Sequence, residues 1–302
     1  MAATHRQHRA AQPLDVVRLT PLMALSSGRP EILIGLVDGP VDMTHPDLVK
    51  ERIREVPGAS GATCADVSSA ACGHGTFVAG MFCGRRGSIA AAICPDCTLA
   101  LRPIFSDLSY EDAMMPSATP DELAAAIVDC IKVGVSVLNL SSALTRPSIR
   151  GERRLEEALD YAMQRKVIVV AAAGNQRNVG STVITRHQAV IPVTACETQG
   201  RPLDYANLGH SIGRRGLSAP GQGVAGLAPE GKVIVSAGTS VAAPFVTGTV
   251  ALIWSRFPTA SALQIKHAIA RAHAQRRASV VPPLLDAWTT YRTAASLVGE
   301  AA

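Results

Sequence analysis

The chain has 302 residues and a formal net charge of +5, and 47% of its residues are hydrophobic while only 4% are aromatic. The charge is mild and dispersed, with no long basic run interleaved with aromatic residues, which argues against a nucleic-acid-binding protein. No apolar run of about 18 residues is present, so no membrane-spanning helix is expected. A core of Ala, Val, Ile and Leu is typical of helices packed on a parallel sheet.

Apolar runs of strand length alternate with amphipathic stretches of helix length, which is the pattern of an α/β fold. Two segments rich in loop-forming residues, 42–70 and 207–231, are expected to be irregular. In chain order, helices are expected over 14–22, 75–81, 121–133, 155–164, 241–254, 263–273 and 284–295, and strands over 31–37, 98–105, 135–140, 167–172 and 189–195.

Three short segments carry residues that can act together in nucleophilic catalysis. Asp38 follows the apolar run 31–37, His74 lies in Gly-His-Gly-Thr, and Ser240 lies in Gly-Thr-Ser-Val-Ala-Ala-Pro. A serine hydroxyl is a poor nucleophile at neutral pH and needs an imidazole to accept its proton. The imidazole in turn needs a carboxylate to fix its tautomer. The three segments therefore predict an acid, a base and a nucleophile.

Each of these residues is expected at the end of a secondary structure element. Asp38 ends a buried strand, so its carboxylate would emerge at the carboxyl edge of the sheet, where open α/β sheets build sites. His74 opens one helix, and Ser240 precedes another, whose N-terminus favours developing negative charge. Taken singly, the three could instead be a capping or turn aspartate, a core histidine and a helix N-cap.

With these motifs in the order Asp, His, Ser, the chain resembles the subtilisin-family serine proteases (subtilases) over roughly residues 15–297. A fourth segment, 167–175, resembles the strand and turn that carry the family's oxyanion-hole asparagine. The resemblance implies that Asn175 donates its side-chain amide to the tetrahedral oxyanion, beside the backbone N–H of Ser240. A plain turn residue is the alternative for Asn175. The implied fold is a three-layer, subtilisin-like α/β fold with a mostly parallel central sheet and helices on both faces.

The resemblance also implies which segments line the substrate cleft. In subtilases the segment after the strand that here ends at Leu140 forms a wall of the pocket for the residue before the cut, usually with the pattern Ser-x-Gly-Gly. This chain has Ser-Ser-Ala-Leu, so the pocket is expected to be smaller or differently shaped, unless the loop is shifted by one residue. The substrate-binding residues that follow are Ser141, Ser142, Ala143, Ala173, Gly174 and Thr239.

Three smaller strings, 36–42 (followed by His45 and Pro46), 102–107 and 217–222, resemble the protease domains of cyanobactin maturation enzymes, the PatA-like and PatG-like groups. Those subtilases cut or cyclise ribosomally made precursor peptides. The macrocyclases of the family carry a helical insertion between the acid and the base, which shields the acyl-enzyme from water. Here Asp38 and His74 are only 36 positions apart, and the interval is rich in loop formers. That interval leaves little room for a lid and predicts hydrolysis.

The sequence thus predicts a serine endopeptidase that acts on a peptide or protein substrate, with leader removal from a precursor peptide as its task. The alternatives are a general intracellular subtilisin-like protease, a PatG-like peptide macrocyclase, and an inactive subtilase fold that serves as a peptide-binding partner. Residues 31–302 would form the catalytic domain, behind an N-terminal extension, 1–30, that contains a short helix. Residues 1–11 are polar and basic, so no secretory signal is recognised and a cytoplasmic location is expected. The oligomeric state is left open.

The sequence contains seven cysteines. Cys94 and Cys97 have a Cys-x-x-Cys spacing, but no second such pair or His pair accompanies them, which argues against a zinc site. Cys64 and Cys72 lie just before His74 and could form a bridge, although free thiols are the commoner state inside cells. No metal or cofactor is expected, and a structural calcium ion is left open.

Overall fold

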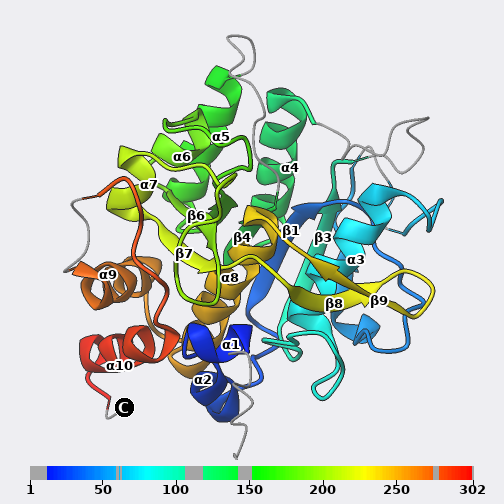
Figure 1. Ribbon diagram of the computed structural model, residues 1–302, viewed down its shortest axis with the longest axis horizontal. Coiled ribbons are helices and arrows are strands. Elements are labelled where there is room, and N and C mark those ends of the chain that lie inside the picture. The colour runs from blue at the N-terminus through cyan, green and yellow to red at the C-terminus, as the bar shows by residue number, and fades with distance from the viewer. Residues whose placement is uncertain are drawn as a thin grey trace, which may run out of the picture.

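The computed structural model describes residues 12–58, 61, 63–105, 118–141, 152–274 and 279–300. At its centre lies a seven-stranded parallel sheet with the strand order β2-β3-β1-β4-β5-β6-β7 (Figure 1). The strands are β1 (Leu33–Asp38), β2 (Ile53–Glu55), β3 (Thr98–Pro103), β4 (Val137–Leu140), β5 (Ile168–Ala172), β6 (Val190–Cys196) and β7 (Leu217–Pro220).

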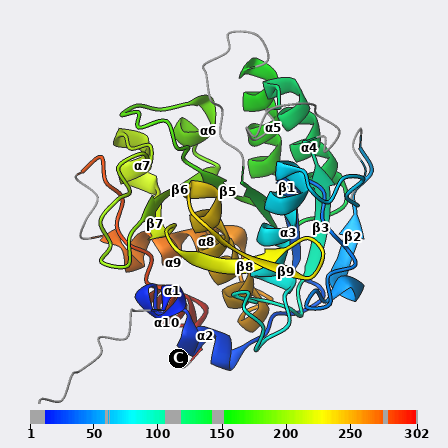
Figure 2. The same ribbon diagram turned by 45° about the vertical axis from the view of Figure 1, so that its right-hand side comes forward.

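Helices cover both faces of this sheet, so the fold has three layers, as predicted (Figures 1 and 2). Successive side chains of a strand point to opposite faces. In β5, Val169 and Ala171 belong to one apolar cluster, and Ile168 and Val170 belong to the other. The first cluster is covered by α4 (Pro120–Lys132), α5 (Glu152–Gln164) and α6 (Val183–Arg186), and the second by α3 (Ala70–Cys83), α8 (Thr239–Arg256), α9 (Ala262–Ala272) and α10 (Ala287–Val298).

The single helix expected over 14–22 is wrong. Two short helices, α1 (Pro13–Val16) and α2 (Thr20–Leu25), are separated at Arg18, which has a positive φ of 51°. Pro21 stands in the first turn of α2, where its missing N–H does no harm, whereas in a continuous helix it would break a hydrogen bond. Both short helices pack against the core that contains α10.

The segment 207–231, expected to be irregular, contains regular structure. It holds α7 (His210–Arg215), strand β7 of the main sheet and β8 (Val224–Ala228). β8 pairs antiparallel with β9 (Lys232–Ser236), and these two strands form a separate ribbon. Elements of four to six residues are too short to produce a clear hydrophobic period, and for this reason the sequence pattern does not reveal them.

The winding of the main sheet reverses at β1, which lies between β3 and β4. Open α/β sheets bind ligands at such a switch point, outside the carboxyl ends of the strands. Asp38 is the last residue of β1 and is fully buried. The sheet therefore delivers this carboxylate to the usual position of a functional site.

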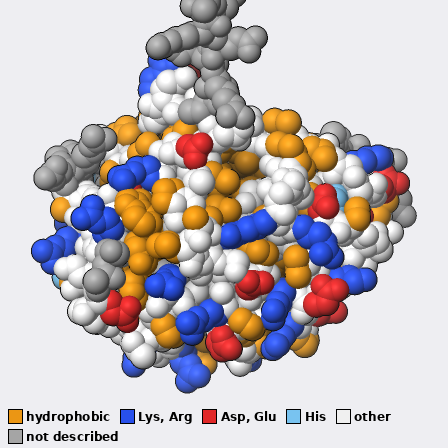
Figure 3. Space-filling view, turned by 90° about the horizontal axis from the view of Figure 1, so that it is seen from below, with side chains coloured by type: hydrophobic (Ala, Val, Ile, Leu, Met, Phe, Trp, Pro, Cys, Tyr) orange, Lys and Arg blue, Asp and Glu red, His pale blue; other side chains and the backbone are white. Residues whose placement is uncertain are grey.

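The longest helix, α8, is buried on nearly every side and packs against β4, β5, β6 and β7. Among the described residues, no helix is long and apolar enough to cross a membrane. On the face shown in Figure 3, basic and acidic side chains are interspersed with apolar ones.

Candidate active site

The structure brings Asp38 and His74 into direct contact. The Nδ1 of His74 lies 2.6 Å from the Oδ1 of Asp38, and the same carboxylate oxygen accepts a hydrogen bond from the backbone N–H of Gly39. Only 13% of the His74 side chain is exposed. A carboxylate on Nδ1 fixes the imidazole as the tautomer in which Nε2 accepts a proton. This is the arrangement of a general base and its orienting acid.

Two glycines make this contact possible. A Cβ on Gly39 would lie 2.1 Å from the carbonyl oxygen of Ala71, and a Cβ on Gly75 would lie 2.2 Å from the carbonyl oxygen of Pro40. No side chain fits at either position, because real Cβ atoms do not approach backbone oxygens so closely. The turn after β1 and the first part of α3 therefore meet backbone to backbone.

The prediction that His74 opens its helix is wrong by one turn. The helix α3 begins at Ala70, with Ser69 as its N-cap, and the hydroxyl of Ser69 accepts a hydrogen bond from the N–H of Cys72. Serine is a preferred N-cap residue, but it lies at the end of a segment whose composition indicates a loop. His74 consequently sits inside the helix, where α3 holds it more firmly than a terminal residue would be held.

The charge of Asp38 controls the protonation of His74. Burial acts to lower the pKa of His74, but the negative charge of Asp38 and its hydrogen bond outweigh burial and raise the pKa above the usual 6.5. The second carboxylate oxygen of Asp38, Oδ2, is buried and has no hydrogen-bond partner among the described residues. The carboxylate therefore depends on the imidazole for much of its charge compensation.

Ser240 is the second residue of α8 and is partly exposed, although Thr239 and Val241 on either side of it are buried. The helix begins after Gly238, whose φ of 127° suits glycine alone. α8 and α3 pack against each other, so the helices that carry Ser240 and His74 are neighbours. The hydroxyl of Ser240 lies at a helix N-terminus, where backbone N–H groups stabilise negative charge.

The loop that carries Asn175 is bonded to the same helix N-terminus. The Oδ1 of Asn175 accepts a hydrogen bond from the N–H of Thr239 at 3.0 Å, and the Oγ1 of Thr239 accepts one from the N–H of Gly174 at 3.1 Å. The amide oxygen of Asn175 is thus engaged next to Ser240, which leaves its NH₂ group as a donor. An amide donor beside a nucleophilic serine is suited to stabilise an oxyanion.

Asn207, which the sequence does not single out, holds this loop in place. Its Nδ2 donates to the carbonyl of Ala173 at 3.0 Å, and its Oδ1 accepts from the N–H groups of Gln176 and Asn178, each at 3.0 Å. The backbone N–H of Asn207 donates to the carbonyl of Gly174 at 2.8 Å. One buried amide therefore fixes the loop on both sides of Asn175. No local motif marks Asn207, since its partners lie about thirty residues earlier in the chain.

The six residues expected to bind substrate divide into three groups. Ser142 and Ala143 lie outside the described residues. Ser141 is nearly buried, and its hydroxyl accepts a hydrogen bond from Asn139 at 2.7 Å. Ala173, Gly174 and Thr239 are buried, with backbone or hydroxyl groups engaged in the loop contacts given above. Their role in substrate binding stays a prediction.

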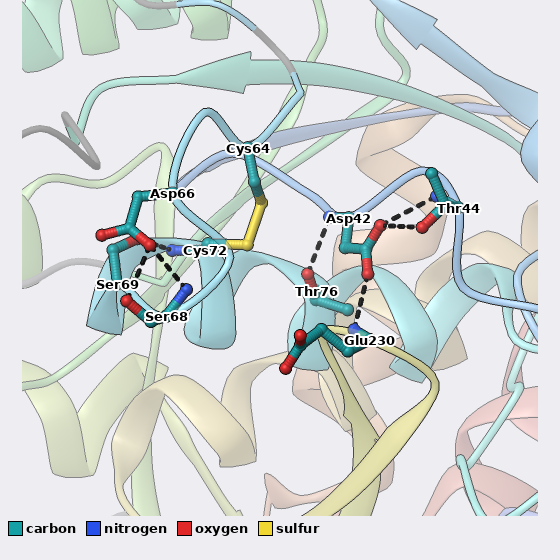
Figure 4. The surroundings of a disulfide bond; sticks show 9 residues. All are labelled: Asp42, Thr44, Cys64, Asp66, Ser68, Ser69, Cys72, Thr76 and Glu230. Atoms are coloured by element: carbon teal, nitrogen blue, oxygen red, sulfur yellow. Dashed lines mark hydrogen bonds between the residues drawn. A yellow bond between two sulfur atoms is a disulfide. The ribbon is translucent and has the colours of Figure 1, made fainter.

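A disulfide lies just before His74 in the chain. Cys64 and Cys72 form a disulfide, as their positions allowed, and it ties the loop before α3 to the first turn of that helix (Figure 4). The other five cysteines are free and buried. In the described part of the chain, no three His, Cys, Asp or Glu side chains gather as a metal site would require. The absence of a metal or cofactor stays a prediction.

We expect Asn175→Ala to lower kcat about 100- to 1,000-fold with little change in KM, a range that comes from the equivalent change in subtilisin. The reason is that the amide hydrogen bond strengthens only as negative charge develops on the substrate oxygen. Steady-state kinetics on a peptide substrate measure both constants. Asn178→Ala is the matched control, because the contacts of Asn178 are made by its backbone. A raised KM with unchanged kcat would make Asn175 a binding or turn residue instead.

Comparison with known proteins identifies the family. Residues 29–287 match the Subtilase family, Peptidase S8. Subtilisin DY from Bacillus licheniformis is 30% identical over 244 residues, which cover 78% of this chain and 81% of that protein. Fervidolysin from Fervidobacterium pennivorans is 28% identical over 286 residues, but the match spans 39% of its length.

Solved structures give the same result. The protease domain of PatA, as a point mutant, matches with a TM-score of 0.79 and 26% identity, over 91% of this chain and 98% of that one. The prenylagaramide maturation protease PagA matches with a TM-score of 0.77 and 25% identity over the same shares. The PatG macrocyclase shares the fold at 20% identity. Since the family match covers most of the chain, including Asp38, His74, Asn175 and Ser240, this protein belongs to the subtilase family of serine peptidases.

Proposed function

We propose that this peptidase cleaves a ribosomally made precursor peptide through an acyl-enzyme on Ser240. The observation that carries the chemistry is the contact of 2.6 Å between His74 and Asp38, beside the helix that begins with Ser240. The imidazole takes the proton of the Ser240 hydroxyl as it attacks, and the Asn175 amide with the Ser240 N–H receives the oxyanion. The protonated imidazole then gives its proton to the leaving amine.

The choice of a precursor peptide as substrate rests on likeness. PatA is the patellamide maturation protease and PagA the prenylagaramide maturation protease, and this chain matches nearly the whole length of their solved chains at 25–26% identity. Leader removal requires only endoproteolysis, which the site provides. A cytoplasmic location belongs to the same proposal, but the Cys64–Cys72 disulfide counts against it because disulfides are rare in that compartment.

A fluorophosphonate probe tests the first part of this proposal, since it labels only an activated serine. Labelling of the wild-type chain supports an enzyme, and a folded chain that resists the probe would be an inactive peptide-binding partner. The second part is tested with a precursor peptide encoded beside the gene and a set of unrelated peptides of equal length. Cleavage of the precursor at one bond supports processing. Equal cleavage of all the peptides would make the chain a general protease, as its likeness to subtilisin DY also allows.

We expect the acyl-enzyme to be hydrolysed rather than cyclised. Among the described residues between Asp38 and His74, the helical ones are the short turn Lys50–Arg52 and the start of α3, so no helical lid covers the site from this interval. Water, at about 55 M, then competes with any amine that is not held in place. Mass spectrometry distinguishes the outcomes, because hydrolysis adds the mass of one water to the summed fragments. A dominant cyclic product would show that another element shields the acyl-enzyme.

A further inference from the structure

The strand that leads to Ser240 is apolar and exposed. In β9, Val233, Ile234 and Val235 expose 56%, 44% and 64% of their surface. Side chains alternate between the two faces of a strand, so three consecutive exposed residues show that neither face of β9 is covered here. Soluble proteins rarely leave contiguous apolar surface of this kind exposed unless it binds something.

β9 also has an unpaired edge. In the described part of the chain the ribbon consists of β8 and β9 alone, and β8 is its inner strand, since a Cβ on Gly226 would lie 2.5 Å from the ring of Phe77 in α3. The outer edge of β9 therefore offers backbone groups to a further strand. Natural edges are usually blunted by lysine or proline. The charged residue of this strand, Lys232, lies at the end remote from Ser240 and is paired with Glu230.

The chemistry of acyl transfer identifies what passes this edge. The carbonyl side of the cut peptide stays on Ser240, while His74 must give its proton to the leaving amine. The segment on the C-terminal side of the cut therefore lies on the side of His74. The helix α3 carries His74, and the ribbon lies across α3 before the chain passes from β9 into α8 (Figures 1 and 2). β9 thus lies on the leaving side of the site.

Hydrogen bonds hold the turn between β8 and β9 in a fixed position, so that the edge of β9 is already in place for a peptide strand. The Oδ2 of Asp42 accepts a hydrogen bond from the N–H of Glu230 at 2.7 Å, and the N–H of Asp42 donates to the Oγ1 of Thr76 in α3 at 2.9 Å (Figure 4). His45 Nε2 donates to the carbonyl of Lys232 at 3.2 Å. Burial acts to raise the pKa of Asp42, but the hydrogen bonds that it accepts outweigh burial and lower the pKa. The anchor therefore stays ionised at neutral pH, and little ordering remains to be done when a peptide binds.

We propose that β9 binds the segment C-terminal to the cut as an added β-strand and so selects substrates whose leaving segment is extended and apolar. Main-chain hydrogen bonds along the β9 edge would supply affinity, and Val233, Ile234 and Val235 would supply the preference for apolar side chains. This inference rests on the proposed function. It adds that, in leader removal, the ribbon binds the segment that leaves as the amine and does not bind the leader, which stays on Ser240 as the acyl group.

Paired peptides and variants test the surface. One peptide carries about six residues after the cut, rich in Val and Ile, and its partner is truncated after two. The double variant Val233→Thr/Val235→Thr keeps the β-branched shape but replaces apolar contacts. We expect kcat/KM for the long peptide to fall roughly 3- to 30-fold, the scale of two cross-strand pairs, with the truncated peptide unaffected. Val133→Thr, an exposed valine at the end of α4, is the matched control.

N-methylation of the long peptide separates strand addition from simple apolar contact. Two peptides are methylated on alternate amides C-terminal to the cut, one on the odd-numbered and one on the even-numbered positions. Only every second N–H faces β9, so one methylated peptide should lose the higher kcat/KM of the long peptide and the other should keep it. Equal kcat/KM for long and truncated peptides, or equal losses on both in the double variant, would overturn the proposal. So would a change of oligomeric state in the double variant by sedimentation, since a second copy would then occupy β9. Failure to cleave the precursor while long apolar peptides keep their advantage refutes the precursor and leaves this surface standing.

Discussion

Ser240→Ala is expected to remove turnover, with a loss of about a millionfold in kcat, the magnitude found for the triad serine of subtilisin. Without the hydroxyl no acyl-enzyme can form, and only the binding and oxyanion contributions remain. The fold should be retained, because Ser240 is partly exposed and the packing of α8 is made by other residues. Labelling by a fluorophosphonate and cleavage of a peptide should disappear together.

The matched control is Ser296→Ala, which removes an exposed hydroxyl from α10. Its kcat should equal that of the wild type. Circular dichroism and thermal unfolding should be the same for both variants and the wild type. A folded Ser240→Ala protein that still cleaves peptide at near-normal rate would assign the nucleophile to another residue.

Asp38→Asn is expected to lower kcat by about 10⁴-fold, because an amide no longer holds His74 in the productive tautomer. The pH profile carries the sharper test. The neutral imidazole is the active base, and its pKa is raised above 6.5, so wild-type kcat/KM should fall as the pH drops through a midpoint above 6.5. The variant removes the charge that raises this pKa and keeps the burial that lowers it. Its midpoint should therefore move to lower pH.

The contact between His74 and Asp38 has the opposite pH dependence in its effect on stability: activity falls at low pH, whereas the stabilisation by this pair is largest there. A raised histidine pKa stabilises the folded state below the imidazole's ordinary pKa, and this contribution is lost as the pH rises through the raised pKa. Urea unfolding should therefore show the largest difference between wild type and Asp38→Asn at acidic pH.

For the activity profile, a midpoint that is the same in wild type and in Asp38→Asn would mean that His74 does not titrate as the base.

The parts of the site that the sequence predicts are those specified by short local segments. Asp38 at the end of an apolar strand, and Asn175 after another, occupy positions that parallel strands dictate, and the structure places both at the carboxyl edge of the sheet. Gly39 and Gly75 stand where no side chain fits, and in the sequence they directly follow Asp38 and His74. Local turn chemistry and strand length suffice for these residues.

The parts that the sequence does not predict depend on distant partners. Asn207 acquires its role only when β6 and the Asn175 loop are side by side, and the run before it looks like any polar loop. The sequence pattern also fails to predict the ribbon of β8 and β9, because the ribbon depends on contacts with a distant part of the chain. In its inner strand Gly226 fits closely against the ring of Phe77 and Leu227 packs against Gly80, and such complementarity has no period along the chain. The break at Arg18 is different, because a local signal marks it: Pro21 fits the first turn of α2 but not the interior of one continuous helix.

The position of α8 in the chain sets when activity can begin. Strands β1 to β7 and the helices between them all precede α8 in order of synthesis, yet α8 supplies Ser240 and covers one face of β4 to β7. Until α8 packs, that face of the sheet is open to water and prone to aggregate. A nascent chain therefore contains Asp38 and His74 long before it contains Ser240, and a chain that ends before α8 lacks the nucleophile that we propose.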